Sequence, residues 1–142
     1  MSDVLLVGIA PRSDEGRELF VSCTDYWHDV VRVCRVLFTD RFPVDATFYA
    51  DRWLAPPTPH LGDAQARRLA ELIDQAFAGD EVARTLDRYY REDALMVEFY
   101  GDEEDRIEAA IEDRCELIRE LAAFLRASGG CEARWHDARG WG

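Results

Sequence analysis

The sequence predicts an α+β fold, with about four helices packed on a small, mostly antiparallel sheet. Short apolar runs bounded by turn residues, which are typical of strands, lie near both ends of the chain. Apolar residues spaced three and four apart, which are typical of amphipathic helices, recur in four longer segments between them. Because 142 residues is near the commonest size of one domain, we expect residues 1–142 to form a single globular domain.

The predicted strands are short apolar runs. Val4–Ile9 and Glu18–Ser22 are separated by a polar turn and should form a hairpin. Leu95–Phe99 is predicted as a further strand, and Ala46–Ala50 and Cys131–Trp135 as shorter ones. These segments together predict the small sheet.

The predicted helices carry residues that can cap their first turn or end their last. The expected N-terminal caps are Thr24, Asp63, Asp80 and Asp102, and Gly79 and Gly129 follow the second and fourth helices. The fourth helix, over residues 102–127, is the longest. Between the first two helices, Arg41–Gly62 contains four prolines and is predicted to be irregular. We assign no role to its loop 55–62.

The charge of the chain restricts its chemistry. The formal net charge is −12, from 29 acidic and 17 basic residues, and every base is arginine because the sequence contains no lysine; it contains no asparagine either. A lysine Schiff base and a phosphate-binding P-loop are therefore excluded. The negative charge argues against direct binding to nucleic acid or to an anionic membrane, and favours a basic protein partner.

The chain is predicted to be soluble and cytoplasmic. The apolar run Val4–Ala10 follows Asp3 rather than a basic segment, and no run approaches the roughly 18 apolar residues that cross a bilayer. Four cysteines without a secretion signal do not imply disulfides. Cys34 and Cys115 fall on apolar stripes, so we expect them to be buried thiols rather than nucleophiles.

Acidic residues line the outward half of the longest predicted helix. Acids at 102–105 are explained by helix initiation. The candidate partner-binding residues are Asp105, Glu108, Glu112, Asp113, Glu116 and Glu120. Spacing of four residues from Glu104 to Glu120 gives like-charge pairs that together cost about 1–2 kcal/mol, which Arg119 should relieve in part. A solvated surface and an electrostatic interface for a basic partner both explain this pattern.

Two patterns suggest a metal site instead. Glu71 and Asp74, like Asp105 and Glu108, are three residues apart and could hold magnesium from one helix face. The pattern C-x-x-x-W-H occurs twice, and its ends are Cys23, His28, Cys131 and His136, a set that could bind zinc. A five-residue step turns about 140° around a helix and points to opposite faces of a strand, so this spacing is poor for one ion.

Three segments resemble a group of small bacterial proteins of unassigned function. They are "FVSCTDYWHDVVRVC", "ARRLAELI" and "LAAFLRASGG", which together extend over much of the chain. Some proteins of this group look like immunity or accessory proteins. The resemblance implies a binding role and transfers no catalytic residue.

These observations lead to one functional hypothesis and one alternative. The leading hypothesis is an immunity-type inhibitor, without cofactor or catalytic residues, whose acidic helix covers the basic cleft of a toxin or of an enzyme that acts on nucleic acid. The alternative is a hydrolase that uses magnesium or zinc through the carboxylate pairs or the Cys and His positions. The sequence leaves a homodimer open.

Overall fold

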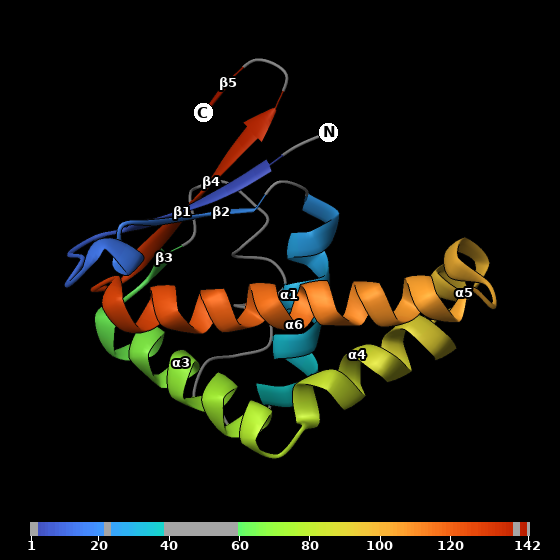
Figure 1. Ribbon diagram of the computed structural model, residues 1–142. Coiled ribbons are helices and arrows are strands. Elements are labelled where there is room, and N and C mark those ends of the chain that lie inside the picture. The colour runs from blue at the N-terminus through green and yellow to red at the C-terminus, as the bar shows by residue number, and fades with distance from the viewer. Residues whose placement is uncertain (1–2, 22–23, 39–59, 138–139, 142) are drawn as a thin grey trace.

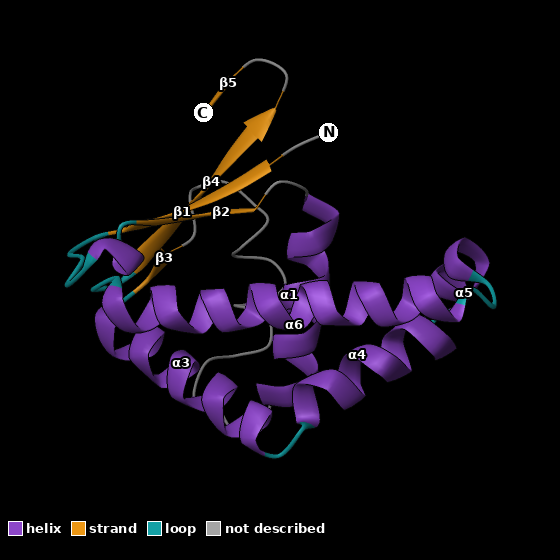
Figure 2. Ribbon diagram, viewed as in Figure 1, coloured by secondary structure: helices purple, strands orange, loops and turns teal. Residues whose placement is uncertain are grey.

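The computed structural model describes residues 3–21, 24–38, 60–137 and 140–141 (Figure 1). The predicted strand Ala46–Ala50 and loop residues 55–59 lie outside these residues. The described residues contain both α-helices and β-strands, and this mixture confirms the predicted α+β class (Figure 2). Strands lie on one side of the longest helix, α6, and helices α3 and α4 lie on the other.

The strands form one antiparallel sheet with the order β2-β1-β4-β3, and β5 pairs with β4. The strands are β1 (Asp3–Gly8), β2 (Glu18–Val21), β3 (His60–Leu61), β4 (Cys131–Asp137) and β5 (Gly140–Trp141). The predicted hairpin is confirmed, because Val4 pairs with Val21. On the other side of β1, Leu6 pairs with Ala133. Strand β3 was not predicted, because two residues are too few for an alternating pattern to show.

Five α-helices occur in the described residues, one more than predicted. They are α1 (Thr24–Phe38), α3 (Asp63–Ala78), α4 (Glu81–Glu92), α5 (Ala94–Tyr100) and α6 (Glu104–Ala127), with a short 3-10 helix at Asp14–Gly16. The four predicted helices are confirmed. The additional helix, α5, replaces the predicted strand Leu95–Phe99, so that prediction was wrong.

Helix α5 has clear end signals that explain the correction. The Asp93 side chain accepts hydrogen bonds from the backbone N–H groups of Leu95 (3.0 Å) and Met96 (3.3 Å). Gly101 follows the helix with a φ of 59°, a conformation that favours glycine. No residue of α5 is fully buried, so no apolar stripe distinguishes it from a strand.

Three predicted caps also differ from the structure. Gly62, not Asp63, precedes α3, and the Gln65 side chain accepts from the Gly62 N–H (3.0 Å). Asp80 occupies the expected position before α4, but its side chain makes no capping hydrogen bond. Glu103 rather than Asp102 precedes α6, and it too lacks a side-chain cap. The acids at the start of α6 therefore act through the helix dipole and through ion pairs.

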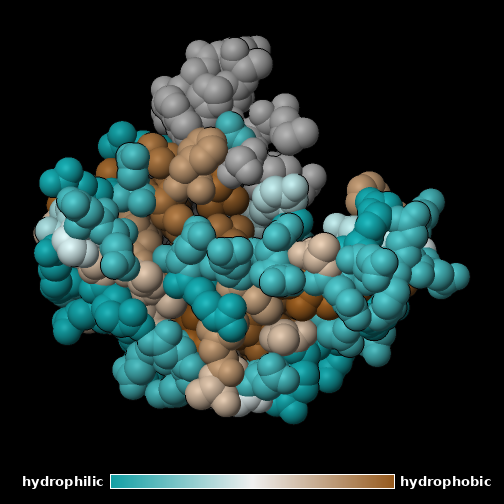
Figure 3. Space-filling model, in the orientation of Figure 1, coloured by the Kyte–Doolittle hydropathy of each residue, from teal (hydrophilic) through white to brown (hydrophobic). Residues whose placement is uncertain are grey.

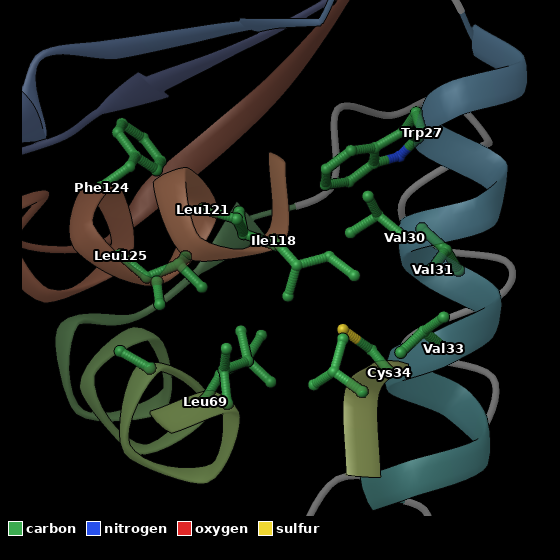
Figure 4. Packing of buried hydrophobic residues seen from close by; sticks show 14 of the residues in the cluster. Trp27, Val30, Val31, Val33, Cys34, Leu69, Ile118, Leu121, Phe124 and Leu125 are labelled. Atoms are coloured by element: carbon green, nitrogen blue, oxygen red, sulfur yellow. The ribbon is translucent and has the colours of Figure 1, made fainter. Parts of the chain in front are cut away.

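The hydrophobic core fixes the position of α6. This helix contacts α1, α3, α4 and the strands β1 and β2. Trp27, Val30 and Cys34 of α1 point towards Ile118 and Leu121 of α6 (Figure 4). Burial of an apolar side chain contributes roughly 1.5–3 kcal/mol, so these contacts hold the helix firmly. The outward side chains of α6 consequently stand on a rigid support.

Candidate functional site

The outward side of α6 carries the six acidic residues that the sequence singled out. They are Asp105, Glu108, Glu112, Asp113, Glu116 and Glu120, and we call this set the acidic face. All six are exposed. None of them forms an ion pair with any residue that the structure describes. Their charges are therefore available to a partner.

Glu104 does not share this environment, although it lies one turn before Glu108. Its two carboxylate oxygens accept hydrogen bonds from the two terminal nitrogens of Arg91, one of them at 2.8 Å. The hydrogen bond from Arg91 and its charge hold the pKa of Glu104 below its usual value. The series of acids without an ion pair to a described residue is therefore interrupted at Glu104.

Arg119 does not offset Glu116 as its spacing predicts. Its guanidinium carbon lies 4.4 Å from the centre of the Phe77 ring, on α3. Stacking on an aromatic ring competes with the weak ion pair that an exposed arginine forms along a helix. Three successive like-charge pairs remain, from Glu108 to Glu120. Each costs a few tenths of a kcal/mol, about 1 kcal/mol in all.

A pocket lies beside the second half of the acidic face, where α6 meets β2 and the start of α1. Its volume is about 240 Å³. It is lined by Phe20, Val21, Tyr26, Asp113, Arg114, Glu116, Leu117 and Glu120, and we call it the aromatic pocket. Hydrophobic surface over the strands adjoins the hydrophilic band along α6 (Figure 3). The pocket thus joins apolar walls to three carboxylates of the acidic face.

One residue that lines the aromatic pocket, Arg114, also belongs to a buried polar cluster. Arg114, on α6, donates from Nε to Oδ2 of Asp29, on α1 (3.0 Å), and Tyr90, on α4, donates to the same oxygen (2.6 Å). All three side chains are buried. Burial, reinforced by the Asp29 carboxylate, raises the pKa of Tyr90 well above its usual value, so its hydroxyl stays a donor. The guanidinium of Arg114 also lies 3.7 Å from the centre of the Tyr26 ring.

Sequence reasoning did not assign the five pocket residues other than the carboxylates to a site, although three of them gave a signal. Arg114 lies four residues from both Ala110 and Ile118, so it falls on the buried stripe of α6. Phe20 alternates with the buried Val21 in β2, which puts it on the opposite face of the sheet. Tyr26 gave the weakest signal, which was only its position next to the buried Trp27 in the same helix. Only the fold brings these segments together.

The carboxylate pairs considered for magnesium do not form a metal site in the described residues. Glu71 pairs with Arg68 (3.1 Å) and Asp74 pairs with Arg126, so arginines occupy both acids. Asp105 and Glu108 are exposed on the acidic face. No group of three His, Cys, Asp or Glu side chains in the described part of the chain is arranged to hold a metal ion.

The zinc hypothesis receives no support from the half that can be placed. Cys131 is buried, and burial raises the pKa of its thiol to about 12. His28 is exposed on α1. Cys23 and the side chain of His136 lie outside the described residues.

The two cysteines predicted to be buried are buried. Desolvation raises the pKa of Cys34 to about 12 and raises that of Cys115 as well. A thiol with a raised pKa is a poor nucleophile at neutral pH. Both residues therefore act as small apolar side chains of the core.

The fold and the candidate site together define a small α+β protein whose acidic face, without ion pairs to any described residue, lies beside an aromatic pocket. No protein-family model matches this chain, and comparisons with curated proteins and with solved structures find no match. The resemblance to small, immunity-like bacterial proteins therefore stays a prediction. None of the helices in the described residues combines the length and the apolar character that crossing a membrane requires.

Proposed function

We propose that the protein is an immunity-type inhibitor that binds through its acidic face to the basic substrate cleft of a toxin or of an enzyme acting on nucleic acid. The observation that carries the proposal is a set of six exposed carboxylates on one rigid helix, none of them paired with a described residue. Repulsion within this set destabilises the free protein slightly. Binding to a basic surface would remove that repulsion, and it would block the cleft.

Charge complementarity also accounts for how such an inhibitor would find its partner. A net charge of −12 attracts a basic protein at long range, and the acidic face directs that attraction to one side of α6. Steering of this kind raises association rates by roughly 10- to 1,000-fold at low salt. It acts mainly on association and on the choice of partner. Because inhibitor and toxin must meet in the same compartment, we propose a cytoplasmic location.

The test needs a basic candidate toxin, sought first among the products of the neighbouring genes and then purified. The variant Glu108→Gln/Glu112→Gln/Glu116→Gln removes three charges from the acidic face. The matched control Glu15→Gln/Glu92→Gln/Glu98→Gln removes three exposed acids from other elements. We expect the first variant to associate about ten-fold more slowly in stopped-flow mixing at low salt, and to inhibit less, while the control stays within about two-fold of the parent.

Salt provides the second measurement. The Debye screening length is only about 3 Å at 1 M ionic strength, so exposed charges hardly interact across the solution. High salt should therefore bring the parent and both variants to the same slow association rate. Equal association rates for the parent and the acidic-face variant at low salt would refute the proposal. A metabolic operon around the gene would count against it as well.

A further inference from the structure

The size of the aromatic pocket selects the kind of ligand it can hold. Its volume of about 240 Å³ exceeds the roughly 150 Å³ of a cavity that admits benzene. It falls below the roughly 300–1,000 Å³ of typical small-molecule sites. A single long side chain of a partner fits this range better than a cofactor or a metabolite does.

The charge of the pocket requires that side chain to be cationic. Asp113, Glu116 and Glu120 contribute three carboxylates, none of them paired with a described residue. Spacings of three and four residues put them on neighbouring turns of one side of α6. Arg114 also lines the pocket, but its charge is balanced by Asp29 at 3.0 Å. The net local charge is therefore negative.

The walls of the pocket favour arginine over lysine. Phe20 and Tyr26 expose 51% and 39% of their surface, and Val21 and Leu117 complete the apolar lining. Aromatic ring faces attract a guanidinium group, as the contact of Arg114 with Tyr26 at 3.7 Å illustrates within the protein itself. A guanidinium can also form paired hydrogen bonds to carboxylates, which a compact ammonium group cannot.

We propose that the aromatic pocket receives one arginine side chain of the basic partner, with its methylene stem against Leu117 and Val21 and its guanidinium between the exposed aromatic rings and the carboxylates of Glu116 and Glu120. This inference rests on the proposed function, because it assigns the arginine to the protein that the acidic face binds. The acidic face attracts many basic surfaces. The pocket selects one that presents an arginine at this point.

The first test needs no partner. N-acetyl-arginine methylamide is titrated into ¹⁵N-labelled protein, and the backbone amides are followed by NMR. We expect saturable shifts centred on Phe20, Val21 and Glu116, weaker binding of N-acetyl-lysine methylamide, and none of the neutral N-acetyl-citrulline methylamide. Two results would overturn the proposal. The first is amide shifts that spread along α6 and do not reach a plateau, and the second is equal binding of the arginine and lysine compounds. Tighter binding of spermidine in the pocket would overturn it in favour of a free polyamine.

Matched variants locate the binding within the acidic face. Glu116→Gln/Glu120→Gln and Glu108→Gln/Glu112→Gln each remove two charges, but only the first pair lines the pocket. We expect the first pair to weaken binding of the arginine compound about ten-fold and the second to change it less than about two-fold. Phe20→Leu keeps an apolar side chain and removes the ring, and should also weaken binding. Equal losses from the two charge pairs would contradict a pocket site.

The candidate toxin then separates this inference from the proposed function. With that partner, the pocket variants Glu116→Gln/Glu120→Gln and Phe20→Leu should accelerate dissociation, whereas Glu108→Gln/Glu112→Gln should mainly slow association. If both charge pairs slow association alike and Phe20→Leu has no effect, the pocket inference fails and the proposed function stands. If no variant changes binding, the proposed function fails with it.

Discussion

Helix α6 carries charged side chains in two opposite environments, one buried and one exposed. On its inner side, the charge of Arg114 is buried, and the carboxylate of Asp29 and the hydroxyl of Tyr90 complete the cluster. On its outer side, no carboxylate of the acidic face forms an ion pair with a described residue. The inner set joins α1, α4 and α6, so the fold needs it. The outer set joins nothing within the described protein, which is why we look outside the protein for its role.

Of the substitutions on the two sides of α6, Arg114→Ala should change the free energy of unfolding most. Removal of one partner leaves the Asp29 carboxylate buried without its counter-charge, which typically costs about 3–5 kcal/mol. We therefore expect a large drop in the free energy of unfolding, measured by urea denaturation. The triple variant Arg114→Met/Asp29→Leu/Tyr90→Phe removes both charges together with the hydroxyl that donates to Asp29, and should recover most of the loss. A loss below about 1 kcal/mol for Arg114→Ala would show that the buried pair is not important for stability.

An effect of opposite sign should follow on the outer side. Glu112→Gln/Glu116→Gln removes all three like-charge pairs between Glu108 and Glu120, so the free energy of unfolding should rise by about 1 kcal/mol at low salt. The gain should shrink as sodium chloride screens the parent. The control Glu15→Gln/Glu98→Gln removes the same charge elsewhere and should change stability less. A destabilised acidic-face variant would mean that these glutamates make contacts within the protein.

The comparison also separates what a sequence can predict from what it cannot. The outward acids of α6 followed from helical periodicity alone, because the apolar stripe that includes Ile107 and Ile118 fixes which side faces solvent. Helix α5 differs from the predicted strand because Leu95–Phe99 is short and rich in residues that both structures accept, and because the Asp93 cap that starts the helix lies outside this apolar run. Boundaries and short elements depend on such local details.

The aromatic pocket and the buried cluster could not be predicted, since both depend on distant segments. Arg114 and Asp29 are 85 residues apart, and Phe20 reaches α6 only through the position of the sheet. A charged residue on an apolar stripe does indicate a buried partner, but the sequence offers 29 acids and does not say which one meets Arg114. Tertiary packing makes that choice.

The smallest effect should come from Glu104, which forms an ion pair with Arg91. Because Arg91 lowers the pKa of folded Glu104, the ion pair stabilises the protein above the pKa of the unfolded side chain, about 4.3, and this contribution is lost as the pH falls through the lower folded value. Glu104→Gln should therefore lower the melting temperature slightly at pH 7 and leave it unchanged near pH 2. The effect is small because the Arg91 and Glu104 side chains are 36% and 55% exposed.

Thermal denaturation of Glu104→Gln between pH 2 and 8, with Glu108→Gln as the matched control, tests this prediction. The two glutamates lie one turn apart on the same helix, and within the described part of the chain only the first has an arginine partner. We expect their effects at pH 7 to have opposite signs, since one substitution removes an ion pair and the other relieves repulsion. Both differences should vanish at low pH, where the carboxylates are protonated. A pH-independent loss for Glu104→Gln would show that packing, rather than charge, explains the contact with Arg91.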